Sequence, residues 1–434
     1  MIFPQPIPQT LRVDITLPTS KSISNRALLL QALCSDGEQG VIGNLAVCDD
    51  TTSMLQGLAA KQMGAPLIDI GAAGTAMRFL TAYLAITEGE TLITGSERMQ
   101  QRPIGTLVEA LRRLGADIAY INKEGYPPLR ICGKRLTGGA LEVEASISSQ
   151  YISALLMIAP RLTEGLTLHL KGHIASRTYI ELTLDLMRRY GATAEWADEQ
   201  TICVVPGQYK SSSLTVEADW SAASYWYELA AVAAHKGHEV DILLRGLTKE
   251  SLQGDRVVAQ LFEPLGVRTE YSEEGAKIAA SPNPSQGGVI GETTMPESPL
   301  LGRGRGEAFI DFTHCPDIAQ TLAVTYCLLG IPYRFSGIRS LRIKETDRVA
   351  ALIAELRKLG YVLRAEGDEC LAWDGTRCQA EEHPTIATYD DHRMAMAFAP
   401  AALCYKELAI EHPEVVTKSY PAFWEHLDKL KIKN

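Results

Sequence analysis

The sequence predicts an α/β fold with a six-fold internal repeat. Two observations predict it: a short amphipathic helix recurs six times along the 434 residues, and strand-like sequence follows most of the copies. Five of the six helices are expected to end at a glycine, and these are Gly64, Gly115, Gly191, Gly266 and Gly360. Each interval between neighbouring glycines can hold a helix and several strands. We therefore expect one symmetric architecture and not a patchwork of unrelated modules.

The six predicted helices, each with its stop, cover residues 50–64, 103–115, 177–191, 254–266, 346–360 and 419–430. Residues 107–114 illustrate the pattern, because apolar side chains recur there at three- and four-residue spacing, with charged side chains on the opposite face. Gly115 then supplies the left-handed conformation that commonly closes a helix.

Hairpins are expected after four of the helices. After Gly115, residues 117–121 alternate polar and apolar side chains, and residues 129–131 form the return strand. The same pattern follows three later stops, at Gly191, Gly266 and Gly360. After Gly64, residues 65–70 leave room for one ordinary strand, so the first unit is expected to be trimmed of its hairpin.

Composition limits the possible classes of protein. With 46% hydrophobic and 22% charged residues, the chain is typical of a globular protein with two domains. Residues 1–6 have no basic or long apolar region, so a signal peptide is not expected. The longest apolar runs, near 152–160 and 395–405, are too short to span a bilayer. Nine cysteines without a Cys-x-x-Cys pair favour reduced thiols, no metal site and a cytoplasmic protein.

The net charge of −10 gives no support for a nucleic-acid or membrane-surface role. Basic residues nevertheless recur in the segments between repeats, at Lys21, Arg26, Arg78, Arg102, Lys344, Arg348, Arg393 and Lys418. Basic groups at loop–helix junctions of an acidic protein indicate a small anionic ligand. The alternative is that these long side chains only cover surface, and the pattern leaves both open.

Three segments have the character of a ligand site. Residues 18–30 read as a helix capped by Ser20 or Ser22, yet Lys21 and Arg26 put cations where the helix dipole is positive. A bound anion would remove that conflict. Residues 71–78 form a glycine-rich corner between strand and helix that matches neither a Walker loop nor a dinucleotide fingerprint.

The third segment, residues 343–348, places Lys344 and Arg348 on one helix face, where Glu345 can pair with Arg348. His392, in the start of a further apolar helix, has no second histidine at ligand spacing, so we expect no metal. There is no nucleophile motif of the Gly-x-Ser-x-Gly kind.

Nine segments, taken together and in order, match one family. They are Ser20-Lys21-Ser22 with Arg26, Ala73 to Arg78, Arg102-Pro103-Ile104, Ser148-Ser149-Gln150, Asp219 to Tyr225, Pro316-Asp317, Lys344 to Arg348, Asp391-His392-Arg393, and Lys418. Over essentially its whole length the chain resembles the 5-enolpyruvylshikimate-3-phosphate (EPSP) synthase family. Each segment is unspecific alone, and the specificity lies in their shared order.

The resemblance implies two similar domains, each of three β/α units in an inside-out α/β barrel-like arrangement, joined by a double crossover. One domain would span residues 20–217, and the other would combine residues 1–19 with 218–434, with the active site in the cleft between them. The implied reaction transfers the enolpyruvyl group of phosphoenolpyruvate to the 5-hydroxyl of shikimate 3-phosphate and releases phosphate. It needs no cofactor and no metal, and we expect a monomer without nucleic-acid or membrane partners.

The resemblance also assigns roles to residues. Asp317 is the implied base for the 5-hydroxyl, with Lys344 beside it, Glu345 is the implied acid for the methylene carbon, and Lys21 contacts both substrates. Shikimate 3-phosphate would contact Lys21, Ser22, Arg26, Ser148, Ser149, Gln150, Ser176, Asp317, Ser340 and Lys344. Phosphoenolpyruvate would contact Lys21, Gly74, Arg102, Gln150, Arg348, Arg393 and Lys418.

The chain departs from the family pattern at two positions, where Ala72 and Ser340 each replace a common Asn. These departures and the trimmed first unit motivate one alternative, a non-catalytic paralogue that binds an anionic metabolite. A second alternative is UDP-N-acetylglucosamine enolpyruvyl transferase, but Glu97 stands where that enzyme has its active-site Cys. A scaffold without a ligand is the third, and the basic junctions argue against it.

Overall fold

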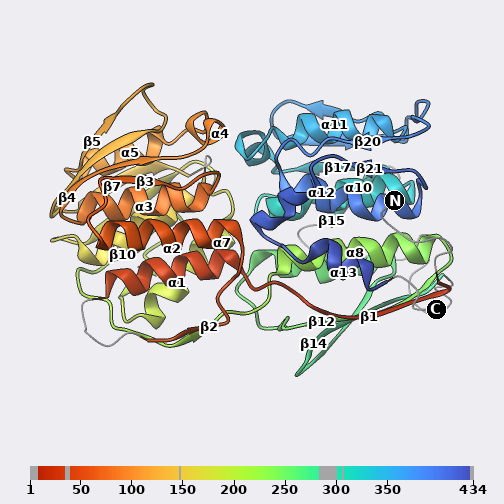
Figure 1. The fold of residues 1–434 in the computed structure, drawn as a ribbon, viewed down its shortest axis with the longest axis horizontal. Coiled ribbons are helices and arrows are strands. Elements are labelled where there is room, and N and C mark those ends of the chain that lie inside the picture. The colour runs from red at the N-terminus through yellow and green to blue at the C-terminus, as the bar shows by residue number, and fades with distance from the viewer. Residues whose placement is uncertain (1–7, 35–39, 146–147, 283–300, 305–306, 431–434) are drawn as a thin grey trace. The chain divides into compact units, whose positions relative to one another are not determined.

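The computed structural model describes residues 8–34, 40–145, 148–282, 301–304 and 307–430 (Figure 1). The segment 1–6, where the sequence predicts no signal peptide, lies outside the described residues. The chain divides into two compact units: unit 1 comprises residues 1–18 and 217–434, and unit 2 comprises residues 19–216. Over the described ranges, none of the helices combines the length and apolar character needed to cross a membrane.

The interior of unit 2 is a layer of helices that are buried on nearly all sides. These are α1 (Lys21–Leu33), α3 (Gly74–Ile86) and α6 (Ser149–Ile158), which contact one another. A helix that is apolar all round is stable only where protein surrounds it. Three amphipathic helices pack against this layer, namely α2 (Asp49–Gln62), α5 (Gly105–Arg113) and α7 (Arg177–Arg189). Figure 1 shows α1, α2 and α3 side by side.

Three sheets complete unit 2. The first, in the order β3-β4-β6-β5, consists of β3 (Leu67–Asp69), β4 (Gly89–Thr94), β5 (Asp117–Tyr120) and β6 (Leu129–Gly133). The second, in the order β7-β8-β10-β9, consists of β7 (Gly139–Glu144), β8 (Leu166–Lys171), β9 (Ala194–Trp196) and β10 (Thr201–Val204). The third is only the parallel pair β2 (Ile42–Gly43) and β11 (Leu214–Thr215). Two short helices, α4 (Glu97–Gln100) and η1 (Ala159–Arg161), lie in the connections.

Unit 1 repeats this plan. Its fully buried helices are α8 (Trp220–His235), α10 (Ala319–Leu329) and α12 (His392–Phe398), which contact one another. Its outer helices are η2–α9–η3 (Gly254–Val257, Val258–Phe262 and Glu263–Leu265), α11 (Arg348–Lys358) and α13 (Phe423–Asp428). Short 3₁₀ helices precede or follow them, namely η4 (Pro316–Ile318), η5 (Arg339–Ile343), η6 (Ala399–Leu403) and η7 (Pro413–Lys418).

The sheets of unit 1 also number three in the described chain. The first, β1-β12-β14-β13, consists of β1 (Thr10–Thr16), β12 (Glu239–Arg245), β13 (Arg268–Ser272) and β14 (Gly275–Ala280). The second, β15-β16-β17-β19-β18, consists of β15 (Leu301–Gly304), β16 (Glu307–Asp311), β17 (Tyr333–Ser336), β18 (Arg364–Glu366) and β19 (Cys370–Trp373). The third is the parallel pair β20 (Thr385–Ile386) and β21 (Ala409–Ile410).

The predicted fold class is confirmed. All five predicted stops, at Gly64, Gly115, Gly191, Gly266 and Gly360, have positive φ angles between 72° and 97°. The single strand predicted after Gly64 is β3, which pairs parallel with β4. The first repeat, which ends at Gly64, therefore lacks a hairpin, as predicted. The last repeat, β20–α12–β21–α13, also lacks a hairpin in the described part of the chain. Each unit therefore has two complete repeats and one short repeat.

Candidate active site

Several of the predicted site residues lie at the N-terminal ends of helices. In unit 2, Lys21, Gly74 and Ser149 are the first residues of α1, α3 and α6. In unit 1, Arg348 is the first residue of α11 and Arg393 the second of α12. Helix N-termini present unsatisfied N–H groups and positive dipole ends, so the repeated β/α unit provides each half of the chain with several anion-binding positions.

In unit 1 the Asp317 carboxylate is surrounded by three basic side chains. Its Oδ1 lies 3.3 Å from both Lys344 Nζ and Arg348 Nη1, and its Oδ2 lies 3.4 Å from Arg393 Nη2. Arg393 Nη1 also donates to the Asp317 carbonyl oxygen at 3.0 Å. The side chain of Asp317 is 13% exposed, so these charges interact in a partly desolvated setting that strengthens them.

Glu345 bridges Arg348 and a further cation, Lys418. Its Oε2 lies 3.0 Å from Arg348 Nη2, and its Oε1 lies 3.0 Å from Lys418 Nζ. The structure thus brings together six of the predicted residues in unit 1, which are Asp317, Lys344, Glu345, Arg348, Arg393 and Lys418. Ser340 lies on η5, four residues before Lys344, and is half-buried.

The protonation of Lys344 is shifted by its surroundings. Burial lowers the pKa of Lys344 below its usual range, Arg348 and Arg393 lower it further, and Asp317 and Glu345 oppose the change. An ammonium group with a lowered pKa gives up its proton more readily, which suits a group next to the proposed base.

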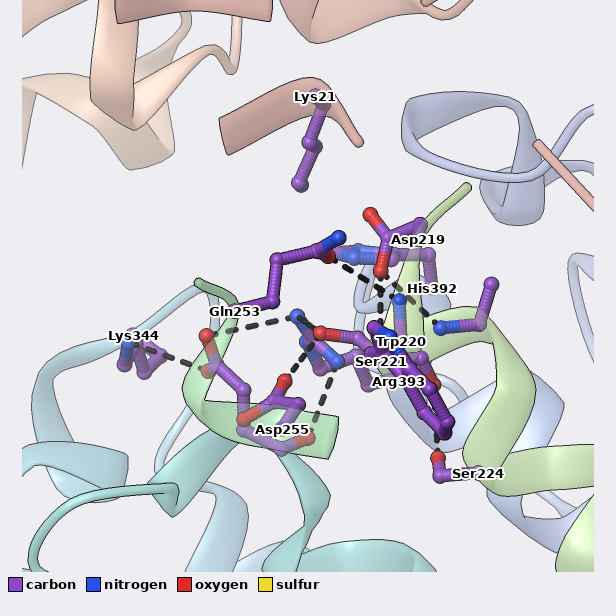
Figure 2. A network of polar contacts seen from close by, with 12 residues as sticks. Lys21, Asp219, Trp220, Ser221, Ser224, Gln253, Asp255, Lys344, His392 and Arg393 are labelled. Carbon is purple, nitrogen blue, oxygen red and sulfur yellow. Dashed lines mark hydrogen bonds and ion pairs between the residues drawn. The ribbon is translucent and has the colours of Figure 1, made fainter. Parts of the chain in front are cut away.

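Asp255 and Ser221 are functional candidates that sequence reasoning missed. Ser221 Oγ donates a short hydrogen bond to Asp255 Oδ2 and accepts one from Arg393 Nη2 at 3.4 Å (Figure 2). Asp255 is 3% exposed, and burial, reinforced by Asp317, raises the pKa of Asp255 to about 7. Ser221 is itself fixed by Asp219, whose Oδ1 accepts from the Ser221 backbone N at 2.8 Å as the cap of α8.

A third residue that was not among the predicted site residues is Asp391. It caps α12, with Oδ1 accepting from the Arg393 backbone N at 2.9 Å, and it binds Arg348 through both carboxylate oxygens. Turned by 180°, the side-chain amide of Gln320 would place its oxygen 3.1 Å from Arg348 Nε and Nη1. The sequence did contain one feature that Asp255 and Asp391 share, namely an Asp at the start of a predicted helix. Asp50 and Asp347 have the same position in other helices.

In unit 2, Lys21 forms an ion pair with Asp50, whose Oδ2 lies 2.8 Å from Lys21 Nζ. Asp50 is in the first turn of α2 and is nearly fully buried, so it holds the Lys21 ammonium at the N-terminus of α1. This pair offsets the local conflict between a cation and the positive end of a helix. Asp50 was not among the predicted site residues.

Gly74, Arg102 and Gln150 gather at the start of α3. A Cβ atom on Gly74 would lie 2.6 Å from Arg102 Nη1, so only glycine lets the guanidinium approach this closely. Gln150 Nε2 donates to Thr75 Oγ1 at 3.1 Å, which places α6 against the same corner. Ala72, which stands in place of the family's common Asn, precedes this corner and is exposed.

The remaining predicted residues of unit 2 lie nearby in the fold. Ser148 caps α6 by accepting from Gln150 N, and Ser176, in a left-handed conformation with φ 55°, precedes α7. Arg26 is 2% exposed and donates to Ser22 O, Ser153 Oγ and Thr183 Oγ1. Burial lowers the pKa of Arg26 to about 10, which still leaves the guanidinium charged near neutral pH.

Across the described ranges, no group of three or more His, Cys, Asp or Glu side chains is arranged to hold a metal ion. The functional groups of the predicted site residues are carboxylates, ammonium and guanidinium groups, hydroxyls and an amide.

Comparison with known proteins identifies the family. Residues 6–67 and 59–427 match the family model described as EPSP synthase (3-phosphoshikimate 1-carboxyvinyltransferase). Proteins named 3-phosphoshikimate 1-carboxyvinyltransferase are similar throughout: that of Bacteroides fragilis is 51% identical over 422 residues, covering 97% of this chain and 96% of the relative. That of Photobacterium profundum is 37% identical, covering 98% of each chain.

A solved structure of EPSP synthase from Acinetobacter baumannii has the same fold, with a TM-score of 0.71 at 20% identity over 98% of this chain and 97% of that one. The enolpyruvyl transferase NikO from Streptomyces tendae follows with a TM-score of 0.65 at 16% identity over 98% of this chain and 95% of that one. These matches favour none of the three alternatives, which were a non-catalytic paralogue, a UDP-N-acetylglucosamine enolpyruvyl transferase and a scaffold without a ligand. The chain belongs to the EPSP synthase family, the 3-phosphoshikimate 1-carboxyvinyltransferases, and is a transferase of the shikimate pathway.

Proposed function

We propose that this chain transfers the enolpyruvyl group of phosphoenolpyruvate to the 5-hydroxyl of shikimate 3-phosphate and releases phosphate, a step toward chorismate and the aromatic amino acids. The observation that supports this most directly is the acid–base cluster of unit 1, where Asp317 and Glu345 lie among Lys344, Arg348, Arg393 and Lys418. Both proposed substrates are small polyanions, which such cations would bind.

In the proposed mechanism the methylene carbon of phosphoenolpyruvate takes a proton, and the 5-hydroxyl adds to the neighbouring carbon while losing its own proton. The tetrahedral intermediate then gives back a proton and expels phosphate. Asp317 takes the hydroxyl proton, and Lys344, whose Nζ lies 3.3 Å from Asp317 Oδ1, holds the carboxylate in place. No covalent bond to the protein is needed.

Glu345 is proposed as the acid that protonates the methylene carbon. Both of its oxygens face cations, which favours the ionised carboxylate. Bound phosphoenolpyruvate would take up the charges of Arg348 and Lys418, so the proton affinity of Glu345 would rise when that substrate arrives. Substrate binding itself would thus prepare the acid.

Each substrate has its own set of proposed contacts. Shikimate 3-phosphate would be held by Lys21, Ser22, Arg26, Ser148, Ser149, Gln150, Ser176, Asp317, Ser340 and Lys344. Phosphoenolpyruvate would be held by Lys21, Gly74, Arg102, Gln150, Arg348, Arg393 and Lys418. The N-terminus of α3 supports these assignments, because it has no side-chain cap and begins at Gly74, next to the Arg102 guanidinium.

We further infer that the enzyme acts as a cytoplasmic monomer. All proposed groups come from one chain, and none of the nine cysteines is in a disulfide, as expected where thiols stay reduced. Light scattering of the purified protein would test the monomer.

The test of function is phosphate release from purified protein given both substrates, with each omitted in turn. Release that needs both is the expected result. Binding of shikimate 3-phosphate by calorimetry without phosphate release would contradict the proposal and favour the non-catalytic paralogue. Release with UDP-N-acetylglucosamine in place of shikimate 3-phosphate would contradict the proposed acceptor.

A further inference from the structure

The segment that leads into α12 contains two consecutive strained residues. Tyr389 and Asp390 have φ angles of 55° and 56°, in the left-handed region that side chains with a Cβ rarely adopt. Two such residues in a row persist only where surrounding contacts hold them. Directly after them come Asp391 and Arg393, which face Arg348 and Asp317.

One helix holds this segment at two points. At its first residue, α11 presents Arg348 to Asp391, with Nε 2.6 Å from Oδ2. Seven residues later, and therefore on the same face, it presents Glu355. Glu355 Oε1 accepts from Tyr389 Oη at 2.7 Å, and Glu355 Oε2 accepts from Ala387 N at 3.0 Å.

The Glu355 carboxylate is fully buried and has several polar partners. It is 0% exposed, and Lys358 Nζ lies 2.7 Å from its Oε2 and donates to Thr385 O at 2.8 Å. The carboxylate thus has a counter-ion, a backbone donor and a phenol donor. Burial and the hydrogen bond to Glu355 raise the pKa of Tyr389 to about 12, so the phenol keeps the proton that it donates.

We propose that Glu355 and Tyr389 are positioning residues, which hold the strained turn at 389–390 so that Asp391 and Arg393 stay aligned with Arg348 and Asp317. Neither residue touches substrate in this proposal. Its kinetic consequence rests on the proposed role of Arg393 toward phosphoenolpyruvate, whereas its structural consequence does not.

The test uses the variant Tyr389→Phe, which removes only the hydroxyl. We expect faster amide hydrogen exchange in residues 387–394 and a roughly two- to tenfold higher KM for phosphoenolpyruvate, the range that one hydrogen bond supplies. Because the turn is strained by Cβ, the double variant Tyr389→Phe/Asp390→Gly should recover slow exchange and the original KM.

The control is Tyr227→Phe, which removes a phenol hydrogen bond of similar length, 2.8 Å from Thr269 Oγ1, elsewhere in unit 1. It should lower the melting temperature without changing exchange at 387–394 or the KM. Unchanged exchange in Tyr389→Phe would overturn the proposal, with or without a change in KM. Absence of transferase activity in the wild type, with exchange altered as described, would overturn the proposed function and leave the positioning role supported.

Discussion

Arg348 Nε lies 2.6 Å from Asp391 Oδ2, and the two side chains are 2% and 0% exposed. Although burial lowers the pKa of Arg348, Asp391, Glu345 and Asp317 together raise it above its ordinary value, so the guanidinium stays charged. The pair joins the first turn of α11 to the cap of α12. A charge buried this deeply depends on its partners, because water cannot replace them.

Replacing Asp391 with Asn should therefore destabilise the protein. Asn can still cap α12, but it leaves Arg348 without its closest counter-charge, and the loss is expected to be on the order of 3 kcal/mol. Urea unfolding measures it. Glu124→Gln is the control, since Glu124 pairs with Arg112 on the surface and is 78% exposed, and it should change stability by less than about 1 kcal/mol. Equal effects of the two variants would show that the buried pair contributes nothing special.

Asp317→Asn should remove most turnover while the protein stays folded and binds shikimate 3-phosphate. A general base typically contributes about 10²–10⁴-fold to the rate, and the amide cannot take the proton. Initial rates of phosphate release measure the change. Asp368→Asn, on the surface next to Arg342 and 74% exposed, is the control and should retain wild-type kcat. Full turnover in Asp317→Asn would exclude this residue as the base.

Asp255 gives a pH dependence with a definite sign. Its pKa is raised from 3.8 to about 7, so between these pH values the folded chain holds a proton that the unfolded chain has lost. The stabilisation from this group is therefore complete below about pH 4 and is lost as the pH rises through 7. Asp255→Asn cannot ionise, so its stability relative to the wild type should rise from pH 5 to pH 8 by on the order of 2 kcal/mol. Parallel stability curves for the two proteins would contradict the raised pKa.

Gly74→Ala should weaken phosphoenolpyruvate binding without unfolding unit 2. The new Cβ would lie 2.6 Å from Arg102 Nη1, and the flexible end of that side chain can move aside. A displaced guanidinium should raise the KM for phosphoenolpyruvate roughly tenfold. Gly207→Ala, where a Cβ would meet nothing within 4 Å, is the control. A KM unchanged by Gly74→Ala would show that Arg102 does not depend on this glycine.

The repeat, the helix stops and the hairpins could be predicted from the sequence because they rest on local chemistry. Gly115 and Gly191 close helices through their own backbone conformation, and the strands after them alternate by pleat. The inner helices were harder: α8 and α10 are buried all round, so they lack the amphipathic period that marked the outer helices.

Some residues of the candidate site could likewise be predicted from the sequence, and others could not. The basic residues at the first helix start, Lys21 and Arg26, were evident from the conflict between their charge and the helix dipole. Their partners were not, because Asp391 is 43 residues from Arg348, and Asp255 is 34 from Ser221. No local pattern connects residues so far apart, and only the packing of α11 against the segment before α12 brings the first pair together.

The pairing of β1 with β12 also sets an order of events during synthesis. β1 leaves the ribosome first, yet its partners, from Glu239 to Arg245, are made after the whole of unit 2. At roughly 5–20 residues per second this delay is on the order of 10–50 s. In that interval the strands of unit 2 can pair among themselves, whereas β1, with Leu11, Val13 and Ile15 along one face, is an unpaired edge. Until β12 is made, β1 therefore presents an open edge that is exposed to aggregation, and a ribosome-bound chaperone that covered it would protect the nascent chain.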